Sequence, residues 1–172
     1  ATSAGRIVLQ TNQAAVVDGD IIGRIDFQPS NETGADALLV GASIYAEADA
    51  TFDASTNATE IVFAVGDGAA VAEKLRLDHD GQLGIGVATP ASLLHVAGSS
   101  GRIVLQTAQV AVAAADVLGR IDFQAPLDTQ GTDGILVTAS ITGVAEETFT
   151  ASVNGTALTF AVADGDAVVE AM

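Results

Sequence analysis

The sequence predicts an all-β protein made of two tandem modules, and three observations lead to this prediction. First, the string GRIVLQ occurs at residues 5–10 and again at 101–106, and GRIDF occurs at 23–27 and 119–123, both with a shift of 96 positions. Second, large apolar residues recur at alternate positions in these strings, as they do in half-buried strands. Third, the segments between them are rich in Asp, Asn, Thr and Gly, which favour turns. A duplication of such long period is typical of modules stacked in a row.

Strands are expected in the same order in both copies. In the first copy they are marked by apolar residues at alternate positions, namely Ile7 and Leu9, Ile25 and Phe27, Leu38 to Ile44, and Ile61 to Val65. In the second copy the equivalent places are held by Ile121 and Phe123 and by Leu158 and Phe160, after one residue inserted in the loop that follows GRIDF. The phenylalanines are expected at inward strand positions. Residues 69–74, 90–94 and 108–116 are the stretches whose composition would permit a helical turn.

Residues 73–96 are expected to form a joint between the two copies. Leu75 and Leu77 fall on one face of a strand, residues 78–81 (DHDG) have the composition of a tight turn, and residues 83–86 (LGIG) return as a second short strand. Its two glycines are predicted to permit close backbone approach between strands of adjacent chains. The residues assigned to this structural joint are Asp78, Gly81, Gly84, Gly86 and Pro90.

The duplication therefore divides the chain into three parts. Residues 1–72 are the first β module, residues 73–100 are the linking hairpin and joint, and residues 101–172 are the second β module. The second copy stops before a joint hairpin of its own. We therefore expect the sequence to belong to a longer polypeptide.

The composition excludes several classes of function. The formal net charge is -16, with 22 acidic residues against 6 basic ones. Nucleic acids and anionic membrane surfaces are recognised by arrays of Lys and Arg, so neither is an expected partner. No apolar run reaches about 18 residues, so no membrane insertion is expected. A strongly acidic protein stays dispersed in brine. The charge therefore fits two interpretations equally well, a protein from a marine or high-salt setting and an acidic protein with no special habitat.

Few residues are candidates for chemistry. Asp78 and Asp80 stand two apart in a turn, as at the start of a calcium loop, but the distal bidentate Glu is missing and a solvated turn is favoured. No cofactor is expected, because the glycines at 84 and 86 lack the third glycine and the helix of a dinucleotide loop. The chain has no Cys and no nucleophile elbow, so no catalytic residue is assigned.

Two arginine–aspartate pairs lie on predicted strands. Arg24 and Asp26, like Arg120 and Asp122, are two residues apart and so share one face of their strand. We expect them to form cross-strand or inter-chain ion pairs, which set register more than they stabilise.

The joint also carries a resemblance to a known family. Residues 76–96, RLDHDGQLGIGVATPASLLHV, resemble the hairpin R-[IL]-D-x-x-G-x-[LV]-G-I-G-x-x-x-P-x-x-x-L-H-V that recurs in tail-fibre and tail-spike proteins of tailed viruses. The two GRIDF strings are also similar to strands of these proteins. The resemblance implies an elongated fibre, a parallel homotrimer, and other virion or appendage proteins as partners. Small modules with few large side chains agree with self-association, because partners would cover their strand edges.

The function implied is a structural segment of a virion tail fibre, or of a similar extracellular appendage, that projects a host-attachment tip toward a host surface glycan or protein. A carbohydrate-binding adhesin module on a cell surface is the second interpretation. It is disfavoured because sugar sites use aromatic platforms, and the chain has one Tyr and 6 Phe. A polysaccharide depolymerase of the tail-spike type is the third. It would need a carboxylate pair such as Glu146 and Glu147 across a glycosidic bond.

Overall fold

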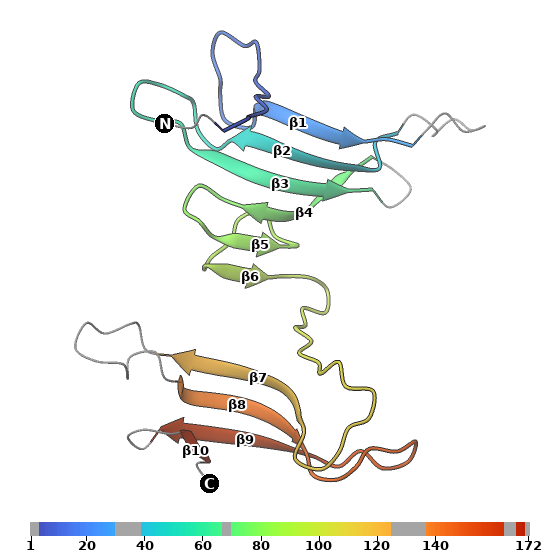
Figure 1. Ribbon diagram of the computed structural model, residues 1–172. Helices are drawn as coiled ribbons and strands as arrows, with labels where there is room; N and C mark the ends of the chain where they lie inside the picture. The colour runs from blue at the N-terminus through green and yellow to red at the C-terminus, as the bar shows by residue number, and fades with distance from the viewer. Residues whose placement is uncertain (1–3, 30–38, 67–69, 125–136, 164–167, 171–172) are drawn as a thin grey trace. The chain divides into compact units, whose positions relative to one another are not determined.

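The structure of the chain is a computed structural model that describes residues 4–29, 39–66, 70–124, 137–163 and 168–170 (Figure 1). The chain divides into two compact units, Ala1–Arg102 and Ile103–Met172. Each unit holds one β-sheet, and the described ranges contain no helix. The predicted all-β class is therefore confirmed, and the described parts of the three stretches that would permit a helical turn form none. No helix of these ranges is long and apolar enough to cross a membrane.

The first unit contains a six-stranded sheet in which the strands follow their order along the chain. They are β1 (Ile21–Phe27), β2 (Ala42–Ala48), β3 (Thr59–Val65), β4 (Ala72–Leu77), β5 (Leu83–Ile85) and β6 (Leu94–Val96). Neighbours from β1 to β5 are antiparallel, whereas β5 and β6 are parallel. Figure 1 shows β1 at one edge of this sheet and β6 at the other.

The predicted joint forms the second half of this sheet. The turn between β4 and β5 closes through hydrogen bonds from the Asp78 amide to the Gln82 carbonyl, at 3.0 Å, and from the Gly81 amide to the Asp78 carbonyl, at 3.1 Å. Gly81 has a φ of 79°, which an L-residue adopts only at a cost. The chain then crosses to β6, where the Ala97 amide donates to the Ile85 carbonyl at 2.9 Å. Residues 73–96 thus extend the sheet of the first module.

The second unit contains a four-stranded antiparallel sheet in the order β10-β9-β8-β7. Its strands are β7 (Val117–Gln124), β8 (Val137–Ala145), β9 (Thr156–Ala163) and β10 (Val168–Glu170). Strands β7 to β9 correspond to β1 to β3 of the first unit. Both edge strands carry a bulge at the same place, between Ile21 and Gly23 in β1 and between Val117 and Gly119 in β7. The duplication in sequence is therefore also a duplication of register.

The better buried face of each sheet is its polar face. In the first unit, Ser43, Val62 and Ala64 are 2%, 0% and 2% exposed, and they lie side by side with charged residues on the same face. The opposite face holds the large apolar side chains, which are only half covered. Phe27 and Phe123 occupy equivalent places there and are 54% and 52% exposed. The expectation of inward phenylalanines is wrong for these two residues in the single chain, because about half of each is exposed on this face.

Candidate functional site

An apolar row crosses the first sheet on one face. Residues directly opposite each other on five successive strands form it, namely Ile25, Ile44, Phe63, Leu75 and Ile85. Cross-strand partners project from the same face, so these side chains lie in one line. The other large side chains of this face are Phe27, Ile61, Val65, Leu77 and Leu83. We call this surface the first apolar face.

The second sheet carries the same feature. Ile121, Ile141 and Phe160 are opposite one another on β7, β8 and β9. Ile121 is 50% exposed and Phe160 53%. Leu158 and Val162 flank Phe160 on the same face of β9, because they are two residues away on either side. We call this surface the second apolar face.

A segment outside the strands contacts each apolar face, through Leu9 in the first unit and Leu105 in the second. We call residues 5–10 and 101–106, which have the identical sequence GRIVLQ, the first and second arms. A Cβ added at Gly23 would lie 2.7 Å from the Cβ of Leu9, and one added at Gly119 would lie 2.8 Å from the Cβ of Leu105. Only glycine permits an approach as close as this. The absence of a side chain at the glycine of each GRIDF string therefore makes room for the arm.

Each arm leaves an open hollow between itself and the sheet. In the first unit the hollow has a volume of about 230 Å³ and lies between Ile7 and Leu9 of the arm and Ile25 and Ile44 of the sheet. In the second unit the equivalent hollow, beside Leu105 and Ile121, has about 280 Å³. The same apolar residues thus line a gap in both units.

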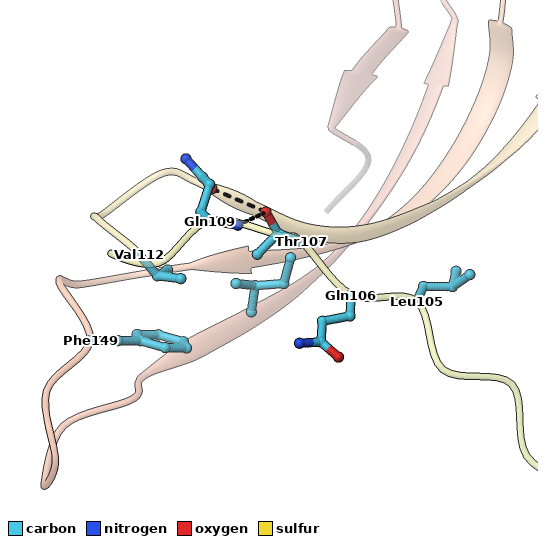
Figure 2. A pocket seen from close by; sticks show the side chains of 7 residues that line it. Leu105, Gln106, Thr107, Gln109, Val112 and Phe149 are labelled. Atoms are coloured by element: carbon cyan, nitrogen blue, oxygen red, sulfur yellow. Dashed lines mark hydrogen bonds between the residues drawn. The ribbon is translucent and has the colours of Figure 1, made fainter.

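A further hollow of about 300 Å³ follows the second arm (Figure 2). Figure 2 shows Phe149 and Val112 at one end of it and Leu105 at the other. Between them, the Thr107 hydroxyl donates to Gln109 Oε1 at 3.3 Å, and the Gln109 amide donates to the Thr107 hydroxyl at 3.3 Å. An aromatic ring beside polar side chains is the kind of lining that a small-molecule site uses.

The predicted arginine–aspartate pairs form along their own strands, on the polar faces. Arg24 and Asp26 are in contact, Arg24 Nη2 donates to Ser43 Oγ at 2.8 Å, and Ser43 Oγ donates to Asp26 Oδ1 at 2.7 Å. The hydrogen bond from Arg24, and then the one from Ser43, lower the pKa of Asp26. Arg120 pairs with Asp122 in the same way. An inter-chain role for these four residues stays a prediction.

A cluster of charges occupies the polar face of the first sheet, and Arg76 is its centre. Arg76 donates from Nε and Nη2 to the two carboxylate oxygens of Glu73, at 2.9 and 2.7 Å, and its Nη2 lies 3.4 Å from Glu47 Oε1. Its Nη1 contacts Oε2 of Glu60, whose side chain is 5% exposed. This buried oxygen makes no regular hydrogen bond, so the guanidinium contact is its compensation. We call these four residues the Arg76 cluster.

The Arg76 cluster holds three carboxylates against one guanidinium. Burial, and then the neighbouring charge of Glu47, raise the pKa of Glu73. The bidentate contact with Arg76 acts on this pKa in the opposite direction. The cluster is therefore a place where the folded chain favours an additional proton.

Three ligand-type side chains converge next to this cluster. Ligand atoms of Asp49, Glu60 and His79 lie within 4.8 Å of one another, in a hollow of about 480 Å³. Carboxylate and imidazole groups are metal ligands in this combination. All three are already engaged, since Glu60 contacts Arg76, and His79 Nδ1 contacts Asp49.

The two aspartates singled out from the sequence have other contacts. Asp78 Oδ1 accepts hydrogen bonds from the amides of Asp80, at 3.0 Å, and Gln82, at 2.8 Å, as expected of a residue that closes a turn. Asp80 lies 3.6 Å from His79 Nε2. Sequence spacing missed Asp49 and Glu60 because they come from separate segments that only the sheet brings to His79.

The glycines of the joint are crowded within their own chain. A Cβ at Gly84 would overlap the carbonyl of Val87 and lie 3.0 Å from Pro90 Cγ, and Pro90 itself is buried. Gly86 has a φ of 73°, and a Cβ there would overlap the carbonyl of Ala97. Close backbone approach is therefore present here, and an approach between adjacent chains stays a prediction.

No family model and no curated protein matches this sequence. Among solved structures, the carboxy-terminal domain of the bacteriophage T5 L-shaped tail fibre is similar, with a TM-score of 0.47 and 13% identity over 99% of this chain and 83% of that one. The same domain with its intra-molecular chaperone domain gives a TM-score of 0.48 and 13% identity, over 99% of this chain and 57% of that one. The chain thus spans 57% of the length of the second structure.

Proposed function

We propose that this chain is a structural segment of a homo-oligomeric fibre, of the tail-fibre type that its joint hairpin resembles. In this proposal, the apolar faces of several copies close on one another. The observation that carries it is the apolar row from Ile25 to Ile85, which crosses five strands and in which Ile25, Phe63 and Ile85 are 38–49% exposed. A sheet with one apolar face must place that face against another layer to be stable in water.

The first apolar face has the size of a patch that often serves a function. The side chains of this face that are 38–54% exposed are Ile25, Phe27, Ile61, Phe63, Val65, Leu77 and Ile85. At roughly 150–200 Å² for a large apolar side chain, they expose on the order of 500 Å². The largest patch on a typical monomer is about 300–600 Å² and is often functional. This chain has a second apolar face of the same kind.

The distribution of charge favours another copy of the same chain as the covering layer. Like chains with a net charge of -16 repel one another wherever their acidic groups meet. Glu47, Glu60 and Glu73 all lie on the polar face, opposite to the apolar row. Apposed apolar faces therefore keep these carboxylates away from those of the neighbouring copy, which lowers the electrostatic cost of association.

The resemblance of the joint adds the finer features of the proposal. These are a parallel trimer, a place in the tail appendage of a virion, and a structural role that projects an attachment tip lying elsewhere. Other virion proteins would then be the neighbours of this segment, and host surface glycan or protein would meet the tip. The chain itself would act as an inert spacer and not as an enzyme.

Light scattering of the 172-residue chain tests the proposal. We expect a mass of three chains at micromolar concentration and at physiological or higher salt. Phe63→Lys, which places a charge in the middle of the apolar row, should lower the mass to that of one chain. Asn57→Lys, which adds the same charge in an exposed loop, should leave the mass unchanged. A wild-type chain that is fully folded and monomeric would overturn the proposal.

The hollow of Figure 2 favours one alternative, a carbohydrate-binding adhesin module. Phe149 would offer a face to a sugar ring, and Gln106 and Gln109 would offer amide groups to its hydroxyls. Binding on a glycan array that is lost in Phe149→Ala would support this function. Phe52→Ala, at the equivalent place in the first unit, is the matched control.

A further inference from the structure

The two arms differ from the strands around them in their backbone. Residues 5–10 and 101–106 belong to no strand, and none of their amides or carbonyls takes part in a backbone hydrogen bond within the described part of the chain. Segments that follow them do pair. The Phe52 amide, for example, donates to the Val16 carbonyl at 3.0 Å, and the Phe149 amide donates to the Val112 carbonyl at 2.9 Å.

The lack of backbone hydrogen bonds in the arms is unfavourable once the apolar faces are buried. The arms contact those faces through Leu9 and Leu105, so a layer that covers the faces also takes these parts of the arms out of water. Backbone groups buried without a partner cost free energy comparable to a lost hydrogen bond. The arm sequence Ile-Val-Leu is rich in residues that favour strands. The arms therefore need a strand partner when the assembly forms.

The arm's own sheet does not supply that partner. Leu9 rests on the face of the sheet at Gly23, above the plane in which ladder hydrogen bonds form. Leu105 rests on Gly119 in the same way. In the proposed oligomer, a backbone ladder would be made with a different copy of the chain.

The duplication points to the edge that receives the arm. The open edges are β1 and β6 in the first sheet and β7 and β10 in the second. Identical arms call for equivalent partners, and β1 and β7 are the equivalent pair, since both carry GRIDF at the same distance from their arm. An arm of six residues also matches these strands, which have 7 and 8 residues.

Charge supports the same pairing. Arg6 and Arg102, at the start of the arms, make no ion pair within the described ranges, although the chain has 22 acidic residues. Acidic residues stand directly before the two edge strands, at Asp18 and Asp20 before β1 and at Asp116 before β7. An arm laid along the edge of a neighbouring copy would bring an arginine toward carboxylates of opposite charge.

We propose that each arm adds as an extra strand to the open edge of β1 or β7 in a neighbouring copy. This strand exchange rests on the proposed homo-oligomer and names the segments that hold its copies together. It satisfies the backbone of the arm and removes two exposed sheet edges at once. Leu9 and Leu105 stay on their own glycines, so each arm links two chains.

Cysteine cross-linking between mixed chains tests this proposal, because the chain has no cysteine of its own. Val8→Cys is refolded together with a second variant that carries one cysteine at residue 24, 25 or 26 of β1. Paired strands bring Cα atoms to about 5.5 Å, within reach of a disulfide. The matched control carries one cysteine at residue 94, 95 or 96 of β6, the other edge of the same sheet.

We expect oxidation to join Val8→Cys to at least one of the β1 variants, and to none of the β6 variants. Amide exchange should agree, with slow exchange in residues 5–10 of the oligomer and fast exchange after its dissociation. Cross-links of Val8→Cys with itself alone would show arms paired with arms and would overturn the proposal. Fast exchange in an intact oligomer would overturn it too, while leaving the proposed function in place. A monomer by light scattering would overturn both.

Discussion

Gly19 and Ala115 occupy the same turn position in the two units, and both have a positive φ, of 82° and 71°. Their amides donate hydrogen bonds of the same length, 2.8 Å, to the carbonyls of Ala48 and Ala145. Within the described ranges Ala115 is the one non-glycine residue with a positive φ. The second copy therefore holds a backbone conformation that its residue type disfavours.

Exchange of these two residues is expected to have opposite effects on the two units. Ala115→Gly should stabilise the second unit by about 1 kcal/mol, because it relieves the left-handed conformation by more than the added entropy of the unfolded chain costs. Gly19→Ala should destabilise the first unit by a similar amount. Urea unfolding at one fixed chain concentration measures both. Equal effects of the same sign would contradict the prediction.

The two positive-φ glycines of the joint should differ in their tolerance of a side chain. Gly81→Ala meets open space and is expected to cost about 1 kcal/mol, the price of the backbone conformation. Gly86→Ala meets in addition the carbonyl of Ala97, so we expect a loss of at least about 2 kcal/mol. Thermal unfolding of the two variants side by side measures the difference. Equal melting temperatures would show that the joint relaxes around the added methyl group.

Loss of the guanidinium of the Arg76 cluster should be costly. Arg76→Met leaves the buried carboxylate of Glu60 without its partner, for which we expect a loss of about 3–5 kcal/mol. The double variant Arg76→Met with Glu60→Gln should recover part of this loss, because no uncompensated charge remains. Arg24→Met, at a pair that is about one-third exposed, is the control and should cost much less. An equal loss of stability in Arg76→Met and Arg24→Met would show that burial of the ion pair does not determine its contribution.

The carboxyl groups of Glu73 and Asp26 should affect the stability of the fold in different pH ranges. The folded-state pKa of Glu73 lies above its ordinary value of 4.5, so the folded chain holds this proton more tightly than the unfolded chain does. Its contribution to stability therefore rises as the pH falls from neutrality through that raised pKa, and is constant below about pH 4.5. Asp26 acts in the opposite way. Its folded-state pKa lies below 3.8, so its contribution is complete above that value and is lost below it.

Glu73→Gln should consequently be at least as stable as the wild type at pH 7, and its stability should change less between pH 7 and 4.5. Asp26→Asn should alter the pH dependence only below about pH 3.8. Urea midpoints across this pH range measure both variants. A Glu73→Gln variant that is less stable at pH 7 would show that the bidentate contact with Arg76 outweighs burial.

Much of the secondary structure could be predicted from local patterns. The alternation at Ile25 and Phe27 and at Leu75 and Leu77 indicated β1 and β4, and the DHDG composition indicated the turn that Gly81 closes with a positive φ. Such signals are carried by residues that are near in sequence, so no tertiary information is needed to interpret them.

The orientation of the faces and the charge clusters could not be predicted in this way. Alternation shows that Phe27 and Asp26 lie on opposite faces of the sheet. It does not show that the face of the phenylalanine is the more exposed of the two in a single chain. The Arg76 cluster joins residues of β2, β3 and β4, whose meeting depends on register. The bulges that set this register have no clear signal in the sequence.

The last prediction concerns the contact between each arm and its glycine. Gly23→Ala would place a Cβ 2.7 Å from that of Leu9, which is closer than carbon atoms approach, so the arm must move off the sheet. We expect a weaker oligomer, seen as dissociation at a higher chain concentration in sedimentation. Leu9→Ala removes the bulk of the opposing side chain but not its Cβ or carbonyl, so it should not restore assembly when combined with Gly23→Ala. Gly41→Ala, where the nearest atom to an added Cβ is 3.5 Å away, is the matched control and should assemble normally. Unchanged assembly of Gly23→Ala would mean that the arm is not held against the sheet in the oligomer.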